Sequence, residues 1–116
     1  MKVIIAGSRT ISKSVPHIND AVILSGFQIT EVVSGGARGV DSDGEIFAQW
    51  KNIPFVRFPA NWDKHGKSAG YIRNNQMALY ADALIAIWDG KSRGTDHMIK
   101  EAKRKGLKVF IHQVQI

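Results

Sequence analysis

The stretch KVIIAGSRT at residues 2–10 decides the fold class of this 116-residue chain. Its first five residues, Lys2–Ala6, form a short β-branched apolar run that predicts a buried strand. A loop of glycine, arginine and hydroxyl residues follows directly, from Gly7 to Thr10. Similar loops follow two later apolar runs, so the same unit of strand and polar loop is expected more than once.

Strands and helices are predicted to alternate through the whole chain. The expected strands are Lys2–Ala6, Ile29–Val33, Pro54–Phe58, Ala83–Trp88 and Lys108–His112, and the expected helices are Ser14–Ser25, Val40–Lys51, Ser68–Tyr80 and Thr95–Lys105. This order predicts an α/β fold, a Rossmann-like three-layer sandwich with a five-stranded, mainly parallel sheet. We expect one domain over residues 1–116.

Apolar side chains at helical spacing are the expected contacts of these helices with the sheet. They are Val15, Ile18, Val22 and Ile23 in the first helix, Ile46, Phe47 and Trp50 in the second, Ile72, Met77 and Leu79 in the third, and Met98, Ile99 and Ala102 in the fourth. Trp88 is also expected to pack.

Composition excludes several classes of protein. The chain is 44% hydrophobic and 22% charged, which is ordinary for a globular domain. No uncharged apolar run approaches the roughly 20 residues of a membrane span, and the N-terminal run is too short for a signal peptide. The absence of cysteine excludes a disulfide frame, a thiolate nucleophile and a Cys-based metal centre. The four histidines show no metal-binding spacing, so no metal is expected.

The net charge of +6 is concentrated in the last quarter of the chain. Residues 1–90 carry nine Lys and Arg against eight Asp and Glu, whereas residues 91–116 carry seven against two. One interpretation is that these cations complement the C-terminal end of a helix dipole. The other is that they attract the phosphates of a nucleotide or a nucleic acid.

Candidate ligand-binding residues follow the first four expected strands. They are Gly7, Ser8 and Arg9; Gly35, Gly36, Ala37, Arg38 and Asp41; Asn61 and Trp62; Arg73 and Asn74; and Asp89, Gly90, Ser92, Arg93, Gly94 and Thr95. The C-terminal ends of parallel strands meet at one edge of the sheet, where ligands bind. Glycine lets backbone amides approach an oxyanion, and arginine matches phosphate oxygens. The loops therefore predict a phosphate-binding pocket.

Specific roles follow from the chemistry of these residues. Phosphates are expected on the backbone amides and side chains around Gly35-Gly36-Arg38 and Ser92-Gly94-Thr95, with charge-assisted bonds from Arg9 and Arg73. Asp41 or Asp89 would accept ribose hydroxyls, and Trp62 would stack on the base. Structural roles stay open: Ser92 or Thr95 as a helix cap, Asp41 in a first helical turn, and Trp62 in packing.

Five segments together resemble the SLOG superfamily of Rossmann-like domains. They are Ala6–Arg9, Ser34–Asp41, Phe58–Trp62, Gly70–Asn74 with Met77, and Trp88–Thr95. The sequence is most similar to a branch of stand-alone bacterial and phage proteins. The resemblance implies a nucleotide-binding domain that is cytoplasmic, in a bacterium or a phage-infected host cell, and homo-oligomeric. Tyr71, Tyr80, Phe110 or Ile116 would supply the apolar contacts between subunits.

Three groups in the superfamily imply different functions. SLOG sensor domains of antiphage systems bind ADP-ribose-derived signals, which implies binding or sequestration of a signalling nucleotide, with no further cofactor. Lonely Guy phosphoribohydrolases cleave nucleoside monophosphates, which implies Arg73 with Asp41, Asp89 or Asp96 as catalytic groups. Their catalytic glutamate corresponds to Met98 here, which favours binding over catalysis. The Smf/DprA proteins bind single-stranded DNA, which makes nucleic acid the third expected ligand.

Overall fold

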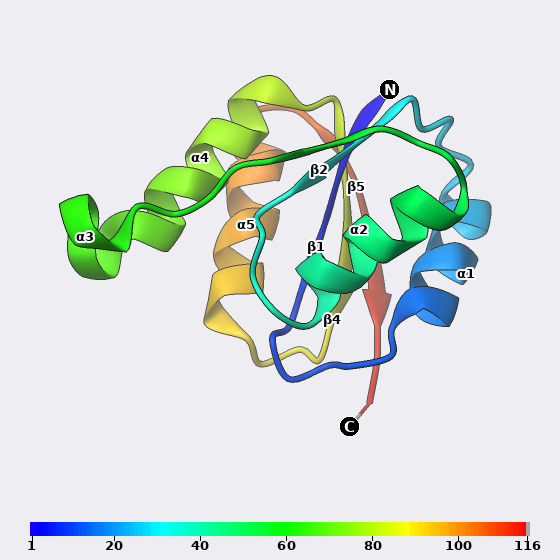
Figure 1. Cartoon of the computed structure of the whole chain (residues 1–116), viewed down its shortest axis with the longest axis horizontal. Coiled ribbons are helices and arrows are strands. Elements are labelled where there is room, and N and C mark those ends of the chain that lie inside the picture. Colours follow the sequence, from blue (N-terminus) through cyan, green and yellow to red (C-terminus); the bar gives the residue numbers. More distant parts are fainter. Residues whose placement is uncertain (116) are drawn as a thin grey trace.

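A five-stranded sheet forms the centre of the computed structural model, which describes residues 1–115 (Figure 1). The strands are β1 (Lys2–Gly7), β2 (Glu31–Ser34), β3 (Phe55–Arg57), β4 (Ala83–Trp88) and β5 (Lys108–Gln113). Their order is β3-β2-β1-β4-β5, and every neighbouring pair is parallel. The predicted α/β fold is confirmed, and the sheet is wholly rather than mainly parallel.

Helices cover both faces of this sheet (Figure 1). They are α1 (Val15–Ser25), α2 (Val40–Trp50), the short α3 (Trp62–His65), a 3₁₀ turn (Gly66–Ser68), α4 (Ala69–Tyr80) and α5 (Arg93–Arg104). In β1, Val3 and Ile5 join the core beneath α1 and α2, whereas Ile4 and Ala6 join the core beneath α4 and α5. Alternate side chains of a strand point to opposite faces, so one buried strand supplies both cores of the three-layer sandwich.

The short helix α3 lies where the sequence predicts only a loop. Asn61 begins it, because its side chain accepts a hydrogen bond from the Lys64 amide at 3.1 Å. One helical turn is too short to produce a recognisable apolar period, and this explains why the pattern misses it.

Several apolar helix residues that were predicted to face the sheet are exposed instead. They are Ile23, Ile46, Trp50 and Leu79, of which Ile23 is 69% and Trp50 58% exposed. In α2 the contact is made by Val40, Gly44, Phe47 and Ala48, which are buried. A Cβ on Gly44 would lie 2.9 Å from Ile5 Cγ2, so the helix approaches the sheet too closely for a larger residue there. Gly44 and Ala48 thus let the helix lie close to the sheet, while Val40 and Phe47 supply the larger apolar contacts.

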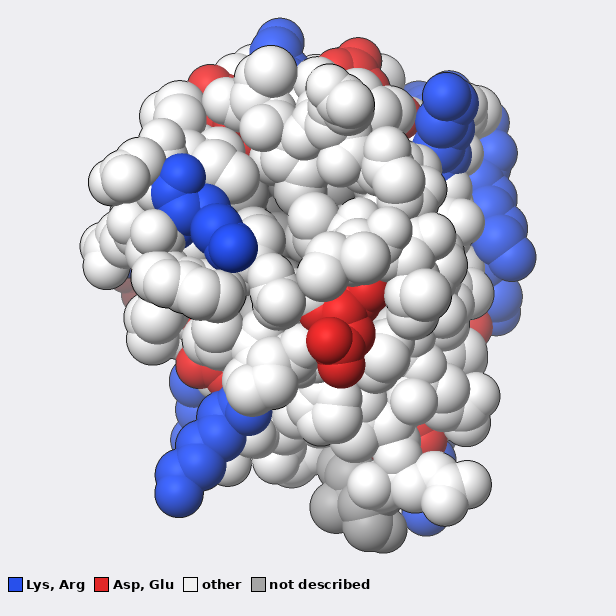
Figure 2. Space-filling view, turned by 90° about the vertical axis from the view of Figure 1, so that its right-hand side faces the viewer, with Lys and Arg blue, Asp and Glu red and all other residues white. Residues whose placement is uncertain are grey.

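The side of the molecule on which α1 lies carries few charged side chains (Figure 2). Figure 2 shows the side of the molecule that lies to the right in Figure 1, where α1 is found, and most of its surface is neither basic nor acidic. On α2, the Trp50 ring is covered by the Lys51 ammonium, which lies 4.0 Å from the ring centroid.

No helix in residues 1–115 combines the length and the apolar character that crossing a bilayer requires. Ile116, one of the residues predicted to contact another subunit, lies outside the described residues.

Candidate functional site

Two adjoining cavities lie at the C-terminal edge of the sheet. The first has a volume of about 520 Å³ and lies at the ends of β1 and β4, beside α4 and the start of α5. The second, of about 490 Å³, lies between the loop that follows β2 and the loop that follows β3. Arg9, Ala37, Trp62 and Arg73 line both cavities, so the two form one continuous site.

Most of the predicted site residues line these cavities. The first is lined by Gly7, Ser8, Arg9, Ala37, Asp41, Trp62, Arg73, Asn74, Asp89, Ser92, Gly94 and Thr95, and the second adds Gly35, Gly36 and Arg38. Asn61, Gly90 and Arg93 line neither. Asn61 caps α3, Gly90 makes a turn at φ +82°, and Arg93 is exposed on the first turn of α5. The fold therefore brings together residues from four loops that are far apart in the sequence, at the edge of the sheet where the strands end.

Arg73 is a buried arginine of the site. It is only 8% exposed, its Nη1 donates to the Gly35 carbonyl at 2.5 Å, and its Nε donates to Asn74 Oδ1 at 3.1 Å. Burial lowers the pKa of Arg73, and the Asp41 carboxylate opposes this shift. Arg73 therefore supports the loop after β2 through its hydrogen bond to the Gly35 carbonyl, and it also lines both cavities.

Asp41 is a buried carboxyl group, 6% exposed, that lines the first cavity. Desolvation by burial raises its pKa from 3.8 to about 6, although Arg73, the Ala37 amide and Arg9 act in the opposite direction. Its Oδ2 accepts a hydrogen bond from the Ala37 amide at 3.2 Å. Asp41 therefore accepts a hydrogen bond within its own loop and lines the first cavity, while its role towards a ribose stays a prediction.

Gly35 marks the point where Asp41 and Arg73 converge. A Cβ built there would lie 2.6 Å from Arg73 Nη1 and 2.7 Å from Asp41 Oδ2, which are distances that real Cβ atoms do not tolerate. A glycine is required at this position because the side chains of Arg73 and Asp41 occupy the space that a third side chain would need.

Several amides that were predicted to hold phosphate are already bonded within their own loops. The Gly36 amide donates to Ser34 Oγ at 3.0 Å, and the Ala37 amide donates to Asp41. In the loop after β4, the amides of Lys91 and Ser92 both donate to Asp89 Oδ1 at 2.8 Å. These two bonds lower the pKa of Asp89. The positive charge available to a ligand therefore comes mainly from side chains rather than from these amides.

The start of α5 combines a cap with an open position. Ser92 is the N-cap, because its Oγ accepts from the Thr95 amide at 3.5 Å and lies 3.1 Å from Thr95 Oγ1. Gly94 has no atom within 4 Å of the place where a Cβ would stand, and it lines the first cavity. Ser92 therefore has the structural role of a helix cap. The N-terminus of α5, next to Gly94, faces the cavity with its partial positive charge.

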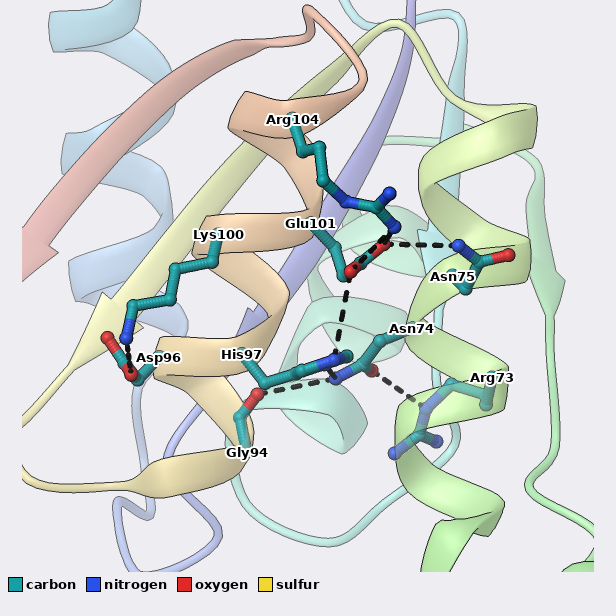
Figure 3. A network of polar contacts seen from close by, with 9 residues as sticks. All are labelled: Arg73, Asn74, Asn75, Gly94, Asp96, His97, Lys100, Glu101 and Arg104. Atoms are coloured by element: carbon teal, nitrogen blue, oxygen red, sulfur yellow. Dashed lines mark hydrogen bonds and ion pairs between the residues drawn. The ribbon is translucent and has the colours of Figure 1, made fainter.

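Asn74 connects Arg73 to α5 (Figure 3). Its side-chain amide lies 3.3 Å from the Gly94 carbonyl and 3.1 Å from His97 Nδ1, while its oxygen accepts from Arg73. His97 Nε2 lies 3.9 Å from Glu101. Since the Arg73 guanidinium can only donate, the Asn74 amide must donate to His97, which leaves the proton of a neutral His97 on Nε2.

Four cationic or aromatic side chains of the site were not predicted. Lys67, Tyr71 and Lys91 line the first cavity, and Arg57 lines the second. Arg57 is the last residue of β3, so the strand-end rule could have found it. Lys67 and Tyr71 flank the start of α4, and only the three-dimensional course of α3 and the 3₁₀ turn brings them to the cavity.

Trp62 and Tyr71 give the first cavity two accessible aromatic rings. Both side chains are about half exposed. The Arg9 guanidinium lies 5.8 Å from the centroid of the Trp62 ring, and the Tyr71 ring stacks on His97 at 4.2 Å. Trp62 is therefore a surface residue of the site and not a core residue.

Only some of the candidate catalytic residues lie at the cavities. Asp96 lines neither cavity and pairs with Lys100 at 2.9 Å (Figure 3), so it does not lie where an acid or base of this site would act. Met98, where the resemblance to Lonely Guy phosphoribohydrolases would place a catalytic glutamate, is 1% exposed and lies in the core beneath α4 and α5. Of the proposed carboxylates, Asp41 and Asp89 line the first cavity.

The basic residues of the last quarter lie mostly on α5. Lys103 and Arg104 occupy its last turn, and Arg104 pairs with Glu101 at 2.7 Å. This placement favours the helix-dipole interpretation of that charge over a phosphate-binding one.

Comparison with known proteins gives one relative in sequence and one in structure, while no protein-family profile matches. DprA, the DNA processing protein A of Streptococcus pneumoniae, has the same fold with a TM-score of 0.73 at 20% identity. The match covers 95% of this chain and 49% of that one, so the chain spans about half the length of DprA.

This likeness to DprA shows the Rossmann-like α/β fold and nothing finer about family or activity. The Gene 61 protein of Mycobacterium phage D29 is 38% identical over an alignment of 85 residues, and the match covers 68% of this chain and 68% of that protein. The chain therefore belongs to the family of the Gene 61 protein of Mycobacterium phage D29.

Proposed function

We propose that the protein binds a nucleotide or an ADP-ribose-derived molecule in the first cavity. The observation that supports this most is that one cavity of about 520 Å³ combines Arg9, Lys67 and Lys91 with the aromatic rings of Trp62 and Tyr71. Ligand pockets have typical volumes of roughly 300–1,000 Å³, and a nucleotide needs both cations and an apolar stacking surface.

Each part of such a ligand has a partner in the cavity. The phosphate would lie against Arg9, Lys91 and the α5 N-terminus at Gly94. The base would lie against Trp62 or Tyr71, and ribose hydroxyls would donate to Asp41 or Asp89. Binding without catalysis is proposed because the glutamate of the hydrolases is replaced by the buried Met98.

A role in sensing or sequestering a signalling nucleotide follows from this proposal. The Gene 61 relative is a phage protein. A phage protein that binds a host signal and does not destroy it would lower the free concentration of that signal by mass action.

Isothermal titration calorimetry with AMP, ADP-ribose and cyclic ADP-ribose tests the proposal. We expect a Kd in the micromolar range or tighter for at least one ligand, and a loss of at least about tenfold in Arg9→Ala. Lys105→Ala, which removes a positive charge at the far end of α5, should bind as the wild type does. Binding weaker than millimolar for all ligands, or an unaffected Arg9→Ala, contradicts the proposal.

Hydrolysis of the ligand is the competing enzymatic function. Chromatography after overnight incubation should recover the intact nucleotide. Release of free base that depends on Arg73 would replace the binding proposal with that of a phosphoribohydrolase.

A second candidate function is binding of single-stranded nucleic acid, which the shared fold with the DNA processing protein DprA favours. Fluorescence anisotropy with a labelled oligonucleotide over a salt series tests it. Affinity for a nucleic acid should fall steeply as salt rises, whereas affinity for a small nucleotide in the cavity should fall less.

Self-association stays a proposal that rests on the family resemblance. Of the described candidates, Tyr71 is exposed, whereas Tyr80 donates to Glu31 and Phe110 packs against the core. Sedimentation velocity at several concentrations distinguishes a monomer from a dimer.

A further inference from the structure

We propose that the second cavity is a separate phosphate site, so that the protein prefers ligands with two phosphate groups over nucleoside monophosphates. This inference rests on the proposed function, in which the first phosphate lies in the first cavity. The ligand class is a nucleotide whose second phosphate is joined through a pyrophosphate or a phosphodiester link.

Charge is the first observation behind this proposal. Four arginines line the second cavity, Arg9, Arg38, Arg57 and Arg73, and no carboxylate is among the lining residues that the structure describes. Glu45 and Asp41 lie nearby and offset part of this charge. Planar guanidinium groups bind phosphate oxygens in pairs, so this lining suits phosphate better than a carbohydrate or an apolar group.

Two consecutive glycines let arginine side chains lie close to the cavity floor. A Cβ on Gly35 would lie 2.6 Å from Arg73 Nη1, and a Cβ on Gly36 would lie 2.7 Å from Arg57 Cδ. Arg73 comes from α4 and Arg57 from β3, so the fold brings two distant arginines to adjacent residues of one loop.

Arg57 is held in place before any ligand binds. Its Nε donates to Glu45 Oε2 at 3.0 Å and its Nη2 to Glu45 Oε1 at 2.5 Å. Glu45 Oε2 also accepts from Ser34 Oγ at 2.7 Å. Within residues 1–115 the Arg57 Nη1 has no hydrogen-bond partner, so one edge of a fixed guanidinium stays available to an anion. Such preorganisation reduces the entropy that binding costs.

The connection between the cavities allows a single ligand to reach both. Arg9 and Trp62 line both cavities and lie against each other, with 5.8 Å between the guanidinium carbon and the ring centroid. A ligand with its base on Trp62 and one phosphate at Arg9 would extend its second phosphate towards Arg38 and Arg57. Arg38 is exposed and makes no hydrogen bond within the described residues, so its substitution should change ligand binding without disturbing the fold.

Calorimetry with AMP, ADP-ribose, the dinucleotide pApA and inorganic pyrophosphate tests the inference. Arg38→Ala removes the exposed arginine, and Arg57→Lys keeps a positive charge beside Glu45 while it removes the planar fork. We expect each variant to bind the preferred two-phosphate ligand and pyrophosphate about ten- to a hundredfold more weakly, and AMP within about twofold of the wild type. Lys105→Ala is the charge-matched control and should leave all affinities unchanged.

The salt dependence gives a readout that a purely structural role would not change. The slope of log affinity against log salt should be shallower by up to about one in Arg38→Ala for a two-phosphate ligand. Preference for ADP-ribose over pApA would identify the pyrophosphate link, and the reverse preference would identify the phosphodiester link.

Two results overturn the inference in different ways. If the wild type binds AMP as tightly as both two-phosphate ligands, or if both arginine variants bind all ligands normally, the second site is refuted and the proposed function stands. If the wild type binds neither nucleotides nor pyrophosphate, both proposals fail.

Discussion

Asp41→Asn should make the protein more stable at neutral pH. Burial raises the pKa of Asp41 from 3.8 to about 6, and a difference of this size between unfolded and folded states corresponds to about 3 kcal/mol. Because the folded state holds the proton more tightly, the stability that Asp41 contributes is fully present below pH 3.8 and is lost as the pH rises to about 6. The asparagine is never charged, and its side-chain oxygen can still accept the hydrogen bond from Ala37.

Urea unfolding at several pH values between 4 and 7 measures this effect. The free energy of unfolding of the variant should be close to that of the wild type at pH 4 and should exceed it by about 2–3 kcal/mol at pH 7. Asp20→Asn removes an equal charge from the exposed surface of α1 and should not reproduce the gain. A difference that stays flat over this range, or a variant that is less stable at pH 7, refutes the assignment of Asp41 as a desolvated carboxylate.

The geometry of the core and the site leads to further predictions for Gly35, Gly94, Met98 and His97. Gly35→Ala should lower the free energy of unfolding by roughly 1–3 kcal/mol, because its methyl group would overlap two side chains. Gly94→Ala, which meets open space in the first turn of α5, should be neutral or slightly stabilising, and equal effects of the two changes in urea titrations would contradict the prediction. Met98→Ala should cost about 2–5 kcal/mol in the same assay, and a cost below about 1 kcal/mol would mean that this position is not a packed core site. Long-range ¹⁵N NMR spectra should show the Nε2-protonated tautomer of neutral His97, and the Nδ1 tautomer would mean that Asn74 is oriented the other way.

Burial patterns explain which parts of the fold were predictable from the sequence. The strands β1 and β4 are continuous apolar runs because both of their faces are covered, and such runs need no knowledge of the rest of the fold. The outward direction of Ile46 and Trp50 was not predictable in this way. It depends on how closely Gly44 lets α2 approach Ile5, which is a tertiary contact.

The sequence predicts where the residues of the candidate site lie better than it predicts their hydrogen bonds. The strand-end rule located the loops of Arg9, Gly35 and Gly94, because parallel strands must end at one edge. It could not show that Asp89 binds the amides of its own loop, since a hydrogen bond of this kind is decided by local geometry. It also missed Lys67, whose place depends on the path of α3.

The two adjacent glycines beneath Arg73 and Arg57 have a consequence for how this family can change during evolution. A larger residue at Gly35 requires a smaller or redirected partner at position 73 or 41, and one at Gly36 requires the same at position 57. Related genes should therefore exchange these residues jointly and seldom one at a time. Sequences that lack either glycine should also lack the arginine that lies against it.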